Sequence, residues 1–244
     1  MGKIKILEKE LKKLVEDGLK DSEICKILKC SEIGVYTARK RYGIIRPSFS
    51  ENYSIKPTKR QLELLLGTLL GDSSFKRDRK NPKFSCEHGE KQREYNYWKY
   101  LELKSLGAKY REYTRKTIDE RTGKFYTSNV LTLKSNPEFL SISNELYKTG
   151  KKEITLEYLK NFSELSLAVL FMDDGSKTNH SIRVYTNSFS TESLNNFIKF
   201  TKDRWDISFN IDKLNQLYLP VKYYSLFKWL IKDYIHPSME YKLH

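Results

Sequence analysis

Two short apolar segments stand out from a polar, lysine-rich chain, and each of them ends in an aspartate. The first covers residues 64–72 and the second covers residues 166–174, and both have the composition of a helix. Taken alone, either segment is a buried apolar helix with a solvated acidic end. A carboxylate at the last turn of a helix faces the negative end of the helix dipole, which disfavours it by roughly 0.3–1 kcal/mol. Two such costs indicate that the aspartates, Asp72 and Asp174, serve a purpose.

The elements predicted after each apolar segment come in the same order. After the first come strands around residue 75 and at 83–88, a helix at 90–106, strands at 109–116 and 125–134, and a helix at 137–147. After the second come a strand at 181–187, a helix at 191–205, strands at 208–213 and 216–219, and a helix at 221–234. Similar units about 100 residues apart predict a pseudo-twofold pair, which is how proteins match the symmetry of duplex DNA.

The first 45 residues predict a compact unit of three helices, at 6–16, 22–28 and 31–42. Asp21 or Ser22 can cap the second helix and Ser31 can cap the third. The apolar positions form the expected inward face: Ile24, Ile27, Leu28, Val35 and Ala38. The short turn at residues 29–30 makes the last two helices look like a helix-turn-helix, whose later helix enters the DNA major groove.

The third predicted helix carries the polar and basic side chains expected to contact DNA: Tyr36, Thr37, Arg39, Lys40 and Arg41. Small three-helix units also serve as plain packing modules, so the alternative of no DNA contact stays open. Two prolines and no apolar periodicity then predict a linker. The expected domains are 1–45 (DNA-binding), 46–59 (linker), 60–155 (first half) and 156–244 (second half).

The charge of the chain points to a polyanionic partner. The formal net charge is +14, and the basic residues are spread along all 244 positions. An AT-rich coding genome also produces lysine-rich chains, which is the alternative when charge stands alone. The 17 Tyr, 12 Phe and 3 Trp exceed what a disordered chain carries and predict a packed fold.

The cysteine count and the length of the apolar runs indicate the cellular compartment in which we expect the protein. Three cysteines are an odd number and do not predict a disulfide framework, so we expect an intracellular protein. The longest apolar run is far below the ~20 residues of a membrane span, and no targeting signal is visible. The compartment, whether bacterial, phage-infected or organellar, stays open.

Both apolar segments resemble the signature motif of the LAGLIDADG homing endonucleases. The copies are Leu-Leu-Gly-Thr-Leu-Leu-Gly-Asp-Ser at 65–73 and Leu-Ala-Val-Leu-Phe-Met-Asp-Asp-Gly at 167–175. The resemblance covers roughly residues 60–244 and is strongest to the single-chain, two-motif, intron-encoded branch. It implies an α+β fold of two pseudo-symmetric αββαββα half-domains with saddle-shaped antiparallel sheets, here preceded by a small all-α unit.

Small residues in the motifs suit a close crossing of two helices, and Gly67, Gly71 and Ala168 are such positions. If the two helices cross, Asp72 and Asp174 project together towards one surface as a site for a divalent cation. Hard oxygen ligands suit Mg²⁺, which is commonly held by one or two carboxylates together with substrate phosphates. On a basic protein this arrangement indicates metal-assisted phosphodiester hydrolysis.

The resemblance implies further site residues. Asp72 and Asp174 would be the catalytic metal ligands, with the carbonyl groups of Gly71 and Asp173 as additional ligands and Mn²⁺ as a substitute for Mg²⁺. Lys152 and Lys242 match the basic residues that lie near the scissile phosphates. Two departures from the motif, Ser73 and Val169, put symmetric activity of the two sites in doubt and leave a nickase open.

The sheets are expected to read DNA, because alternate side chains of a strand share a face. In the strand at 181–187 the apolar alternation places Ile182, Val184 and Thr186 in the core. The outward residues of the two halves are the candidate DNA contacts: Lys76, Arg77, Lys109, Arg111, Arg115, Lys116, Arg183, Tyr185, Asn187, Gln216 and Tyr218. Each of these could equally face water.

Other site chemistries find little support in the sequence. Cys86 and His88 form one short pair without a second pair at zinc-ligand spacing, and no phosphate-binding glycine loop or nucleophile elbow occurs. We therefore expect a monomeric, site-specific endonuclease that cuts both strands of a long double-stranded DNA target, leaves 3′ overhangs and spreads a mobile intron, intein or free-standing gene. The alternative is a non-cleaving nucleic-acid-binding protein, either a maturase of intron RNA or a repressor.

Overall fold

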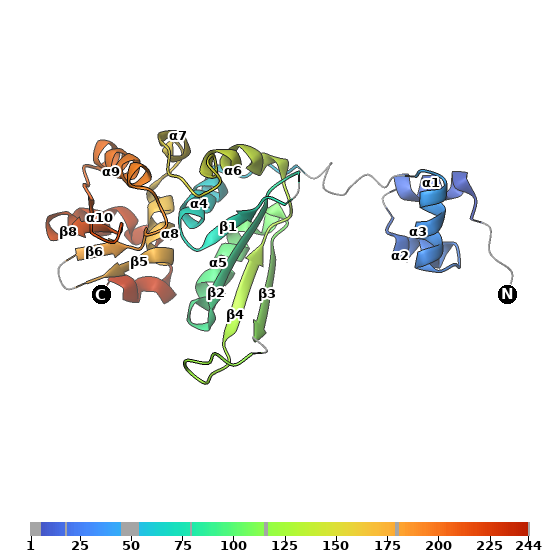
Figure 1. Cartoon of the computed structure of the whole chain (residues 1–244), viewed down its shortest axis with the longest axis horizontal. Coiled ribbons are helices and arrows are strands. Elements are labelled where there is room, and N and C mark those ends of the chain that lie inside the picture. The colour runs from blue at the N-terminus through green and yellow to red at the C-terminus, as the bar shows by residue number, and fades with distance from the viewer. Residues whose placement is uncertain are drawn as a thin grey trace. The chain divides into compact units, whose positions relative to one another are not determined.

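The computed structural model describes residues 6–17, 19–44, 54–78, 80–114, 117–178 and 181–243. The chain divides into two compact units, Met1–Tyr53 and Ser54–His244. The described part of the first unit is built from helices, and that of the second unit from antiparallel sheets with their helices (Figure 1). Each unit has a hydrophobic core of its own.

The first unit consists of α1 (Glu8–Glu16), α2 (Asp21–Ile27) and α3 (Glu32–Arg41). The expected cap of α3 is confirmed, because the Ser31 hydroxyl accepts a hydrogen bond from the Gly34 amide at 3.0 Å. The expected cap of α2 is wrong, since Lys20 precedes this helix. The Glu23 carboxylate accepts from the Lys20 amide at 2.7 Å, so the helix begins one residue earlier than a cap at Asp21 requires.

The core of this unit follows the expected inward face with one exception. Its buried side chains are Leu11, Val15, Ile24, Val35 and Ala38, and the expected Leu28 packs half-buried against them. Ile27 was expected among them, but it is 52 % exposed. It is the last residue of the seven-residue α2, three positions after the buried Ile24. Leu28, four positions after Ile24, packs against the core in its place, because residues four apart share a helix face.

The second unit contains two successive groups of elements in the order helix, two strands, helix, two strands, helix. The first group is α4 (Lys59–Leu70), β1 (Ser73–Lys76), β2 (Lys83–Gly89), α5 (Arg93–Leu103), β3 (Lys109–Thr114), β4 (Thr127–Thr132) and α6 (Leu140–Leu146). The second group is α8 (Glu164–Asp174), β5 (Gly175–Lys177), β6 (Ser181–Val184), α9 (Thr191–Trp205), β7 (Asn210–Ile211), β8 (Leu217–Pro220) and α10 (Tyr224–Ile231). The short α7 (Leu156–Leu159) connects them.

Short 3₁₀ turns extend several of these helices: η1 (Glu90–Gln92), η2 (Lys104–Leu106), η3 (Pro137–Phe139), η4 (Val221–Tyr223), η5 (Lys232–Tyr234) and the tail η6 (Pro237–Leu243). The two antiparallel sheets have equivalent strand orders, β1-β2-β4-β3 and β5-β6-β8-β7. The predicted α+β class and the duplicated αββαββα order are therefore confirmed.

The helices α4 and α8 pack against each other between the two sheets (Figure 1). A Cβ atom added at Gly67 would lie 2.4 Å from the carbonyl oxygen of Ser166. A Cβ at Gly71 would lie 2.5 Å from the Cβ of Asp173. Only glycine allows this approach of the two helices, so the small residues of the first motif have the packing role expected from the sequence.

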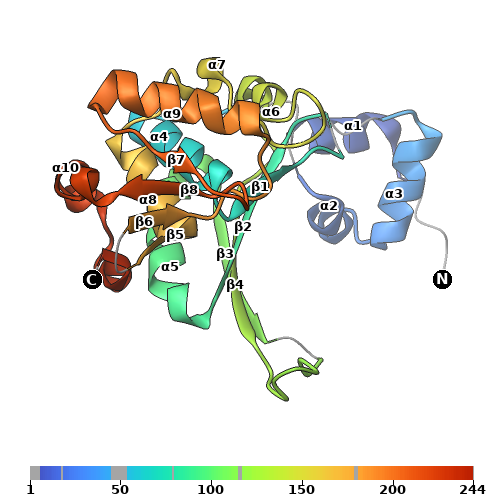
Figure 2. The same cartoon turned by 60° about the vertical axis from the view of Figure 1, so that its left-hand side comes forward.

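The first sheet extends further than the second. Figures 1 and 2 show β3 and β4 running past the end of α5 as a long hairpin. One face of the sheet carries the buried residues Phe84, Cys86 and His88 of β2, which point towards α5. Among the described residues, no helix is long and apolar enough to cross a bilayer.

Candidate functional site

The two motif aspartates lie at the ends of the paired helices. Asp72 follows Gly71, the residue that ends α4, and Asp174 is the last residue of α8. Burial and the negative charges of Asp173 and Asp174 raise the pKa of Asp72 to about 7. Burial and the charge of Asp173 raise the pKa of Asp174 to about 6. The three carboxylates therefore crowd negative charge at one place.

The carboxylate of Asp174 has no hydrogen-bond partner among the residues that the structure describes, and the Asp72 side chain is 34 % exposed. Partly accessible carboxylates that repel one another suit a hard divalent cation, because a cation supplies the missing counter-charge. The donor set at the ends of α4 and α8 therefore fits Mg²⁺ or Mn²⁺.

Two lysines occupy matching positions beside the motif ends. The Lys152 ammonium donates to the carbonyl oxygens of Gly71 at 3.1 Å and Ser73 at 2.7 Å. The Lys242 ammonium donates to the carbonyl oxygens of Met172 at 2.6 Å and Asp173 at 2.9 Å. Each lysine is thus held by the backbone of the motif in its own half. The carbonyl groups of Gly71 and Asp173, expected as metal ligands, are the ones that accept from these lysines.

The charge of each lysine also interacts with the motif carboxylates of both halves. Burial lowers the pKa of Lys152, and Asp174 opposes this effect more strongly than any other charge. Burial likewise lowers the pKa of Lys242, opposed by Asp173 and Asp72. A partly buried lysine beside carboxylates is placed to stabilise negative charge that develops on a phosphate. The structure therefore brings together all four residues expected to carry the chemistry.

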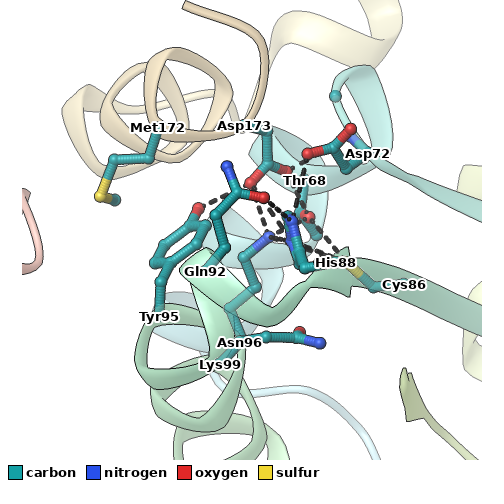
Figure 3. Close-up of polar contacts among 12 residues, drawn as sticks. Thr68, Asp72, Cys86, His88, Gln92, Tyr95, Asn96, Lys99, Met172 and Asp173 are labelled. Atoms are coloured by element: carbon teal, nitrogen blue, oxygen red, sulfur yellow. Dashed lines mark hydrogen bonds and ion pairs between the residues drawn. The ribbon is translucent and has the colours of Figure 1, made fainter. Parts of the chain in front are cut away.

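Asp173 has a different environment, because it enters the core of the first half (Figure 3). Its side chain is 0 % exposed. One oxygen, Oδ1, accepts from the Lys99 ammonium at 2.6 Å and the Tyr95 hydroxyl at 2.8 Å. The other, Oδ2, accepts from the Thr68 hydroxyl at 2.7 Å. Burial opposes its ionisation, but the charge of Lys99 and the hydrogen bonds from Lys99 and Thr68, together with the neighbouring His88, offset this and hold the pKa of Asp173 below its usual range.

Lys99 is the cation that balances this buried carboxylate. It is also 0 % exposed and donates to the Thr68 hydroxyl at 2.9 Å, besides its contact with Asp173. Burial lowers its pKa, but Asp173, Cys86 and Asp72 together outweigh burial and keep the pKa of Lys99 above its usual value. The pair is therefore charged, as a buried ion pair with its hydrogen bonds satisfied must be.

His88 links this buried pair to Asp72. The imidazole Nε2 lies 3.0 Å from the Lys99 ammonium, and Nδ1 lies 2.7 Å from the Gln92 Oε1 and 3.3 Å from the Asp72 Oδ2. Ammonium only donates, so Nε2 must accept and the ring proton must be on Nδ1. Burial and Lys99 lower the pKa of His88 to about 4, so the ring is neutral at physiological pH.

Asp72, His88 and Asp173 each offer one ligand atom within 4.8 Å of the others, which is the geometry of a cation site. The Lys99 ammonium already provides the positive charge there, 2.6 Å from Asp173. A divalent cation beside it would be repelled, and the His88 Nδ1 already carries a proton. We therefore assign this cluster to positioning, and the partly exposed Asp72 and Asp174 to a metal.

The candidate DNA contacts of the first half share the sheet face opposite His88. Thr132 of β4 pairs with Ser85 of β2 on one side and with Lys109 of β3 on the other. Lys109 and Ser85 therefore lie on the same face of the sheet. Lys76 and Arg111 lie on the same face by alternation, and the side chains of Lys76, Lys109 and Arg111 are exposed. Arg77 is exposed and stacks 4.3 Å from the centre of the Tyr147 ring. Arg115 and Lys116 lie outside the described residues.

In the second half the alternation predicted for residues 182–187 is confirmed, with Ile182, Val184 and Thr186 buried. Of the outward residues, Arg183 of β6 pairs with Tyr218 of β8 in register. Tyr185, Asn187 and Gln216 lie next to the ends of these strands, where Gln216 donates to Asn187 at 3.3 Å and Tyr185 is exposed. Arg183 is not a free cation, since its guanidinium lies 2.6 Å from the Asp212 carboxylate.

The candidate DNA contacts of the N-terminal unit also include both exposed side chains and one cation that is paired within the protein. Tyr36, Thr37, Lys40 and Arg41 are exposed on α3. Arg39 instead forms two hydrogen bonds with the Asp21 carboxylate, at 2.9 and 2.7 Å, which join α3 to α2. Four of the five predicted side chains are therefore accessible to a ligand, and the fifth supports the packing of the unit.

Sequence reasoning missed the buried polar residues of the first half, above all His88 and Lys99. A signal existed for both. Strict alternation in β2 places His88 on the same face as Phe84 and Cys86. Helical spacing places Lys99 on the same face as Tyr95 and Leu103. A charged residue on a predicted inward face is a reason to search for a buried partner.

The comparison with protein families agrees with this geometry. The family model of the LAGLIDADG DNA endonuclease family matches residues 62–229, which include both motif helices and both sheets. The chain belongs to the LAGLIDADG DNA endonuclease family. The match excludes α1–α3, so the family says nothing about the first unit.

The individual relatives of this chain carry different names. The chain is 28 % identical over 205 residues to "Protein RecA" of Mycobacterium shimoidei, a match that covers 75 % of this chain and 46 % of that protein. The chain thus spans about half the length of such relatives. It is also 28 % identical over 204 residues to "Probable intron-encoded endonuclease 1" of Wickerhamomyces canadensis, covering 76 % of this chain and 84 % of that one.

A solved structure supports the fold of this family member. The homing endonuclease I-WcaI bound to its DNA recognition sequence is 25 % identical and superposes with a TM-score of 0.70. The match covers 84 % of this chain and 97 % of that chain. The likeness therefore includes both half-domains.

Proposed function

We propose that this protein is a monomeric, site-specific endonuclease that hydrolyses both strands of a long double-stranded DNA target and leaves 3′ overhangs. The observation that carries the proposal is the arrangement at the ends of α4 and α8, where Asp72 and Asp174 lie beside Lys152 and Lys242. One chain supplies both aspartates and both lysines, so a single copy is sufficient for two cuts. Membership of the LAGLIDADG DNA endonuclease family supports the reaction class.

The residues divide the work as follows. Asp72 and Asp174 would hold Mg²⁺, with Mn²⁺ as a substitute. The carbonyl groups of Gly71 and Asp173 already accept from Lys152 and Lys242, and each would contribute through its second lone pair. The bound metal would activate water and neutralise the leaving oxygen. Lys152 and Lys242, anchored on the motif backbones, would stabilise charge on the two scissile phosphates.

The outward sheet faces would hold the duplex. Lys76, Lys109 and Arg111 in the first half would contact phosphates, because these cationic side chains are exposed on the outward face of the first sheet. In the second half, Tyr185, Gln216 and Tyr218 would contact base edges in the major groove, with Arg183 and Asn187 ordered by their neighbours. Binding that depends on many cations should weaken steeply as salt is raised.

The first test is cleavage of a randomised duplex library with Mg²⁺, with Ca²⁺ as a non-catalytic control. The wild-type protein is expected to yield one long consensus cut on both strands, and Asp72→Asn and Asp174→Asn are each expected to lose about a thousandfold or more in rate. Mapping the ends of each strand tests the 3′ overhang. Tight binding of selected DNA or RNA without cutting would replace this proposal by a regulator or an RNA maturase.

A second test concerns the N-terminal unit. We propose that α3 extends the DNA footprint through Tyr36, Thr37, Lys40 and Arg41. Deletion of residues 1–50 is then expected to shorten the protected region while the cut position stays the same. An unchanged footprint would leave the unit with a packing role only.

A further inference from the structure

The end of helix α2 brings two cysteines of the first unit close together. The helix ends at Ile27, and Lys29 then takes a left-handed conformation with φ 48°. The Cys30 amide donates to the carbonyl oxygen of Cys25 at 3.0 Å. A hydrogen bond between residues five apart after a left-handed residue marks a Schellman helix end, in which the side chains of the two bonded residues frequently pack against each other.

The backbones of the two cysteines are near enough for a disulfide. Because one N–H···O=C hydrogen bond joins the two residues, standard bond lengths keep their Cα atoms less than about 7 Å apart. Two cysteines can be bridged without backbone movement when their Cα atoms lie within about 7 Å and their side chains face each other. The end of α2 therefore meets the first of these two conditions.

The side chains of both cysteines lie against the same core. Each is half-buried and packs against the hydrophobic core of the first unit. The Cys25 thiol donates to the Ser22 carbonyl at 3.3 Å, which holds it beside α2. Burial raises the pKa of the Cys30 thiol, and the neighbouring Cys25 raises it further. The packing of the helix end and this influence of one thiol on the other support the second condition for a bridge.

The third cysteine of the chain has a different environment. Cys86 is 1 % exposed inside the second unit, where its thiol contacts Thr68, His88 and Lys99. A thiol buried in this way is inert towards reagents in solution. The two partly exposed thiols are therefore the pair at the end of α2.

We propose that Cys25 and Cys30 form a reversible disulfide, which a low-molecular-weight disulfide in solution makes by thiol–disulfide exchange. The thiolate of one cysteine attacks the oxidant, releases one thiolate and leaves a mixed disulfide. The thiolate of the other cysteine attacks the mixed disulfide and releases the second thiolate. The two cysteine protons pass to the two released thiolates, so two thiols of the protein are oxidised and one disulfide is reduced. The inference is independent of the proposed function.

The disulfide would fix the turn between α2 and α3. Cys30 directly precedes Ser31, which caps α3, so a bond to Cys25 ties the start of α3 to the end of α2. Units of fewer than about 70 residues have small cores and depend more on cross-links, and the first unit ends at Tyr53. Oxidation is therefore expected to hold α3, with its exposed Lys40 and Arg41, more firmly to α2.

The experiment uses the full-length protein in buffers of reduced and oxidised glutathione, with free thiols blocked before digestion. Trypsin cleaves after Lys26 and Lys29, so the two cysteines are separated into the peptides 21–26 and 30–39. We expect mass spectrometry of the oxidised protein to find these two peptides joined by a disulfide. Hydrogen exchange of the amides of α2 and the turn is expected to slow by about tenfold or more on oxidation.

Cys25→Ser and Cys30→Ser are the matched controls, because each keeps one of the two thiols. Each variant is expected to stop at the mixed disulfide with glutathione, and its exchange rates in α2 should change by less than about twofold between the two buffers. Cys86, in the peptide 84–91, is the internal reference and should remain a free thiol until the protein is unfolded.

Three results would overturn the inference. The first is a wild-type protein that carries separate glutathione adducts on Cys25 and Cys30. The second is a disulfide that joins two molecules and is lost on dilution. The third is a link within one molecule that leaves the exchange of α2 unchanged, because the bond would then not fix the turn. Neither measurement needs DNA or a metal, so a protein that cuts no DNA overturns the proposed function and leaves this test intact.

Discussion

The two half-domains share their order of elements and their strand order, yet their cores are built from different chemistry. The buried residues of α5 are Tyr95, Asn96, Lys99 and Leu103, and those of α9 at the same spacing are Ser193, Leu194, Phe197 and Thr201. Lys99 thus corresponds to Phe197. By strand register, Cys86 and His88 correspond to Val184 and Thr186.

The charged interior of the first half is connected to the crossing of α4 and α8. Asp173 of α8 lies opposite Gly71 of α4, where a Cβ on Gly71 would come within 2.5 Å of the Asp173 Cβ. The glycine leaves room for a carboxylate that enters the first half, and the first half supplies Lys99, Tyr95 and Thr68 to receive it. A duplicated fold can therefore keep its backbone symmetry while one inserted charge changes the interior of one copy.

The largest expected effect comes from removing the buried cation. Lys99→Met leaves the Asp173 carboxylate buried without a counter-charge, and we expect it to lower the free energy of unfolding by about 3–5 kcal/mol. Phe197→Leu, the change at the matching position, should cost about 1–2 kcal/mol. Urea unfolding followed by tryptophan fluorescence measures this, because all three tryptophans lie in the unit Ser54–His244.

Asp173→Asn in the Lys99→Met background should recover much of the loss, since the amide needs no counter-charge. Equal costs for the Lys99 and Phe197 changes, or no recovery in the double variant, would show that the two cores do not differ in the way described.

The sequence predicted the shared part of the halves and not the part that differs. Periodicity located α9 and the strands around Phe84 and Ile182 well, because apolar spacing depends on local geometry and both halves repeat it. The ends of the motif helices were found from the aspartates themselves. The Lys99–Asp173 pair could not be predicted, because the partners are 74 positions apart and their meeting depends on how two helices cross.

The next largest expected effect concerns the crossing of α4 and α8, where equivalent motif positions carry side chains of different size. Gly67 of α4 corresponds in the motif to Val169 of α8, and a Cβ at Gly67 would also lie 2.9 Å from the Val169 Cβ. Gly67→Ala must move the backbone of α8, so we expect a loss of about 1–3 kcal/mol in the free energy of unfolding. Gly89→Ala is the control, because nothing lies within 4 Å of the added Cβ there, and it should change stability by less than about 0.5 kcal/mol.

The same fluorescence titration compares the two glycine variants. A Gly67→Ala protein as stable as the wild type would mean that the helices can separate at no cost, and that the room for Asp173 does not depend on a fixed crossing.

The smallest effect concerns the two aspartates in the metal-free protein. Their pKa values, about 7 for Asp72 and about 6 for Asp174, lie above the ordinary value of 3.8, so ionisation costs the folded state more than the unfolded state. Wild-type stability should therefore fall as pH rises from about 4 to 7 and then level off. Asp72→Asn and Asp174→Asn remove this cost, and after allowance for solvent screening we expect a gain of about 1 kcal/mol, or about 2–4 °C in Tm, at pH 8.

The gain should shrink towards pH 4, and it should level off at a lower pH for Asp174→Asn than for Asp72→Asn. Thermal unfolding in a chelator measures both curves, and the addition of Ca²⁺ is the control, since the cation should stabilise the wild type more than either variant. A metal-free Asp72→Asn protein less stable than the wild type at pH 8 would mean that the contact with His88 outweighs the repulsion from Asp173 and Asp174, and the two aspartates would then differ in sign instead of in degree.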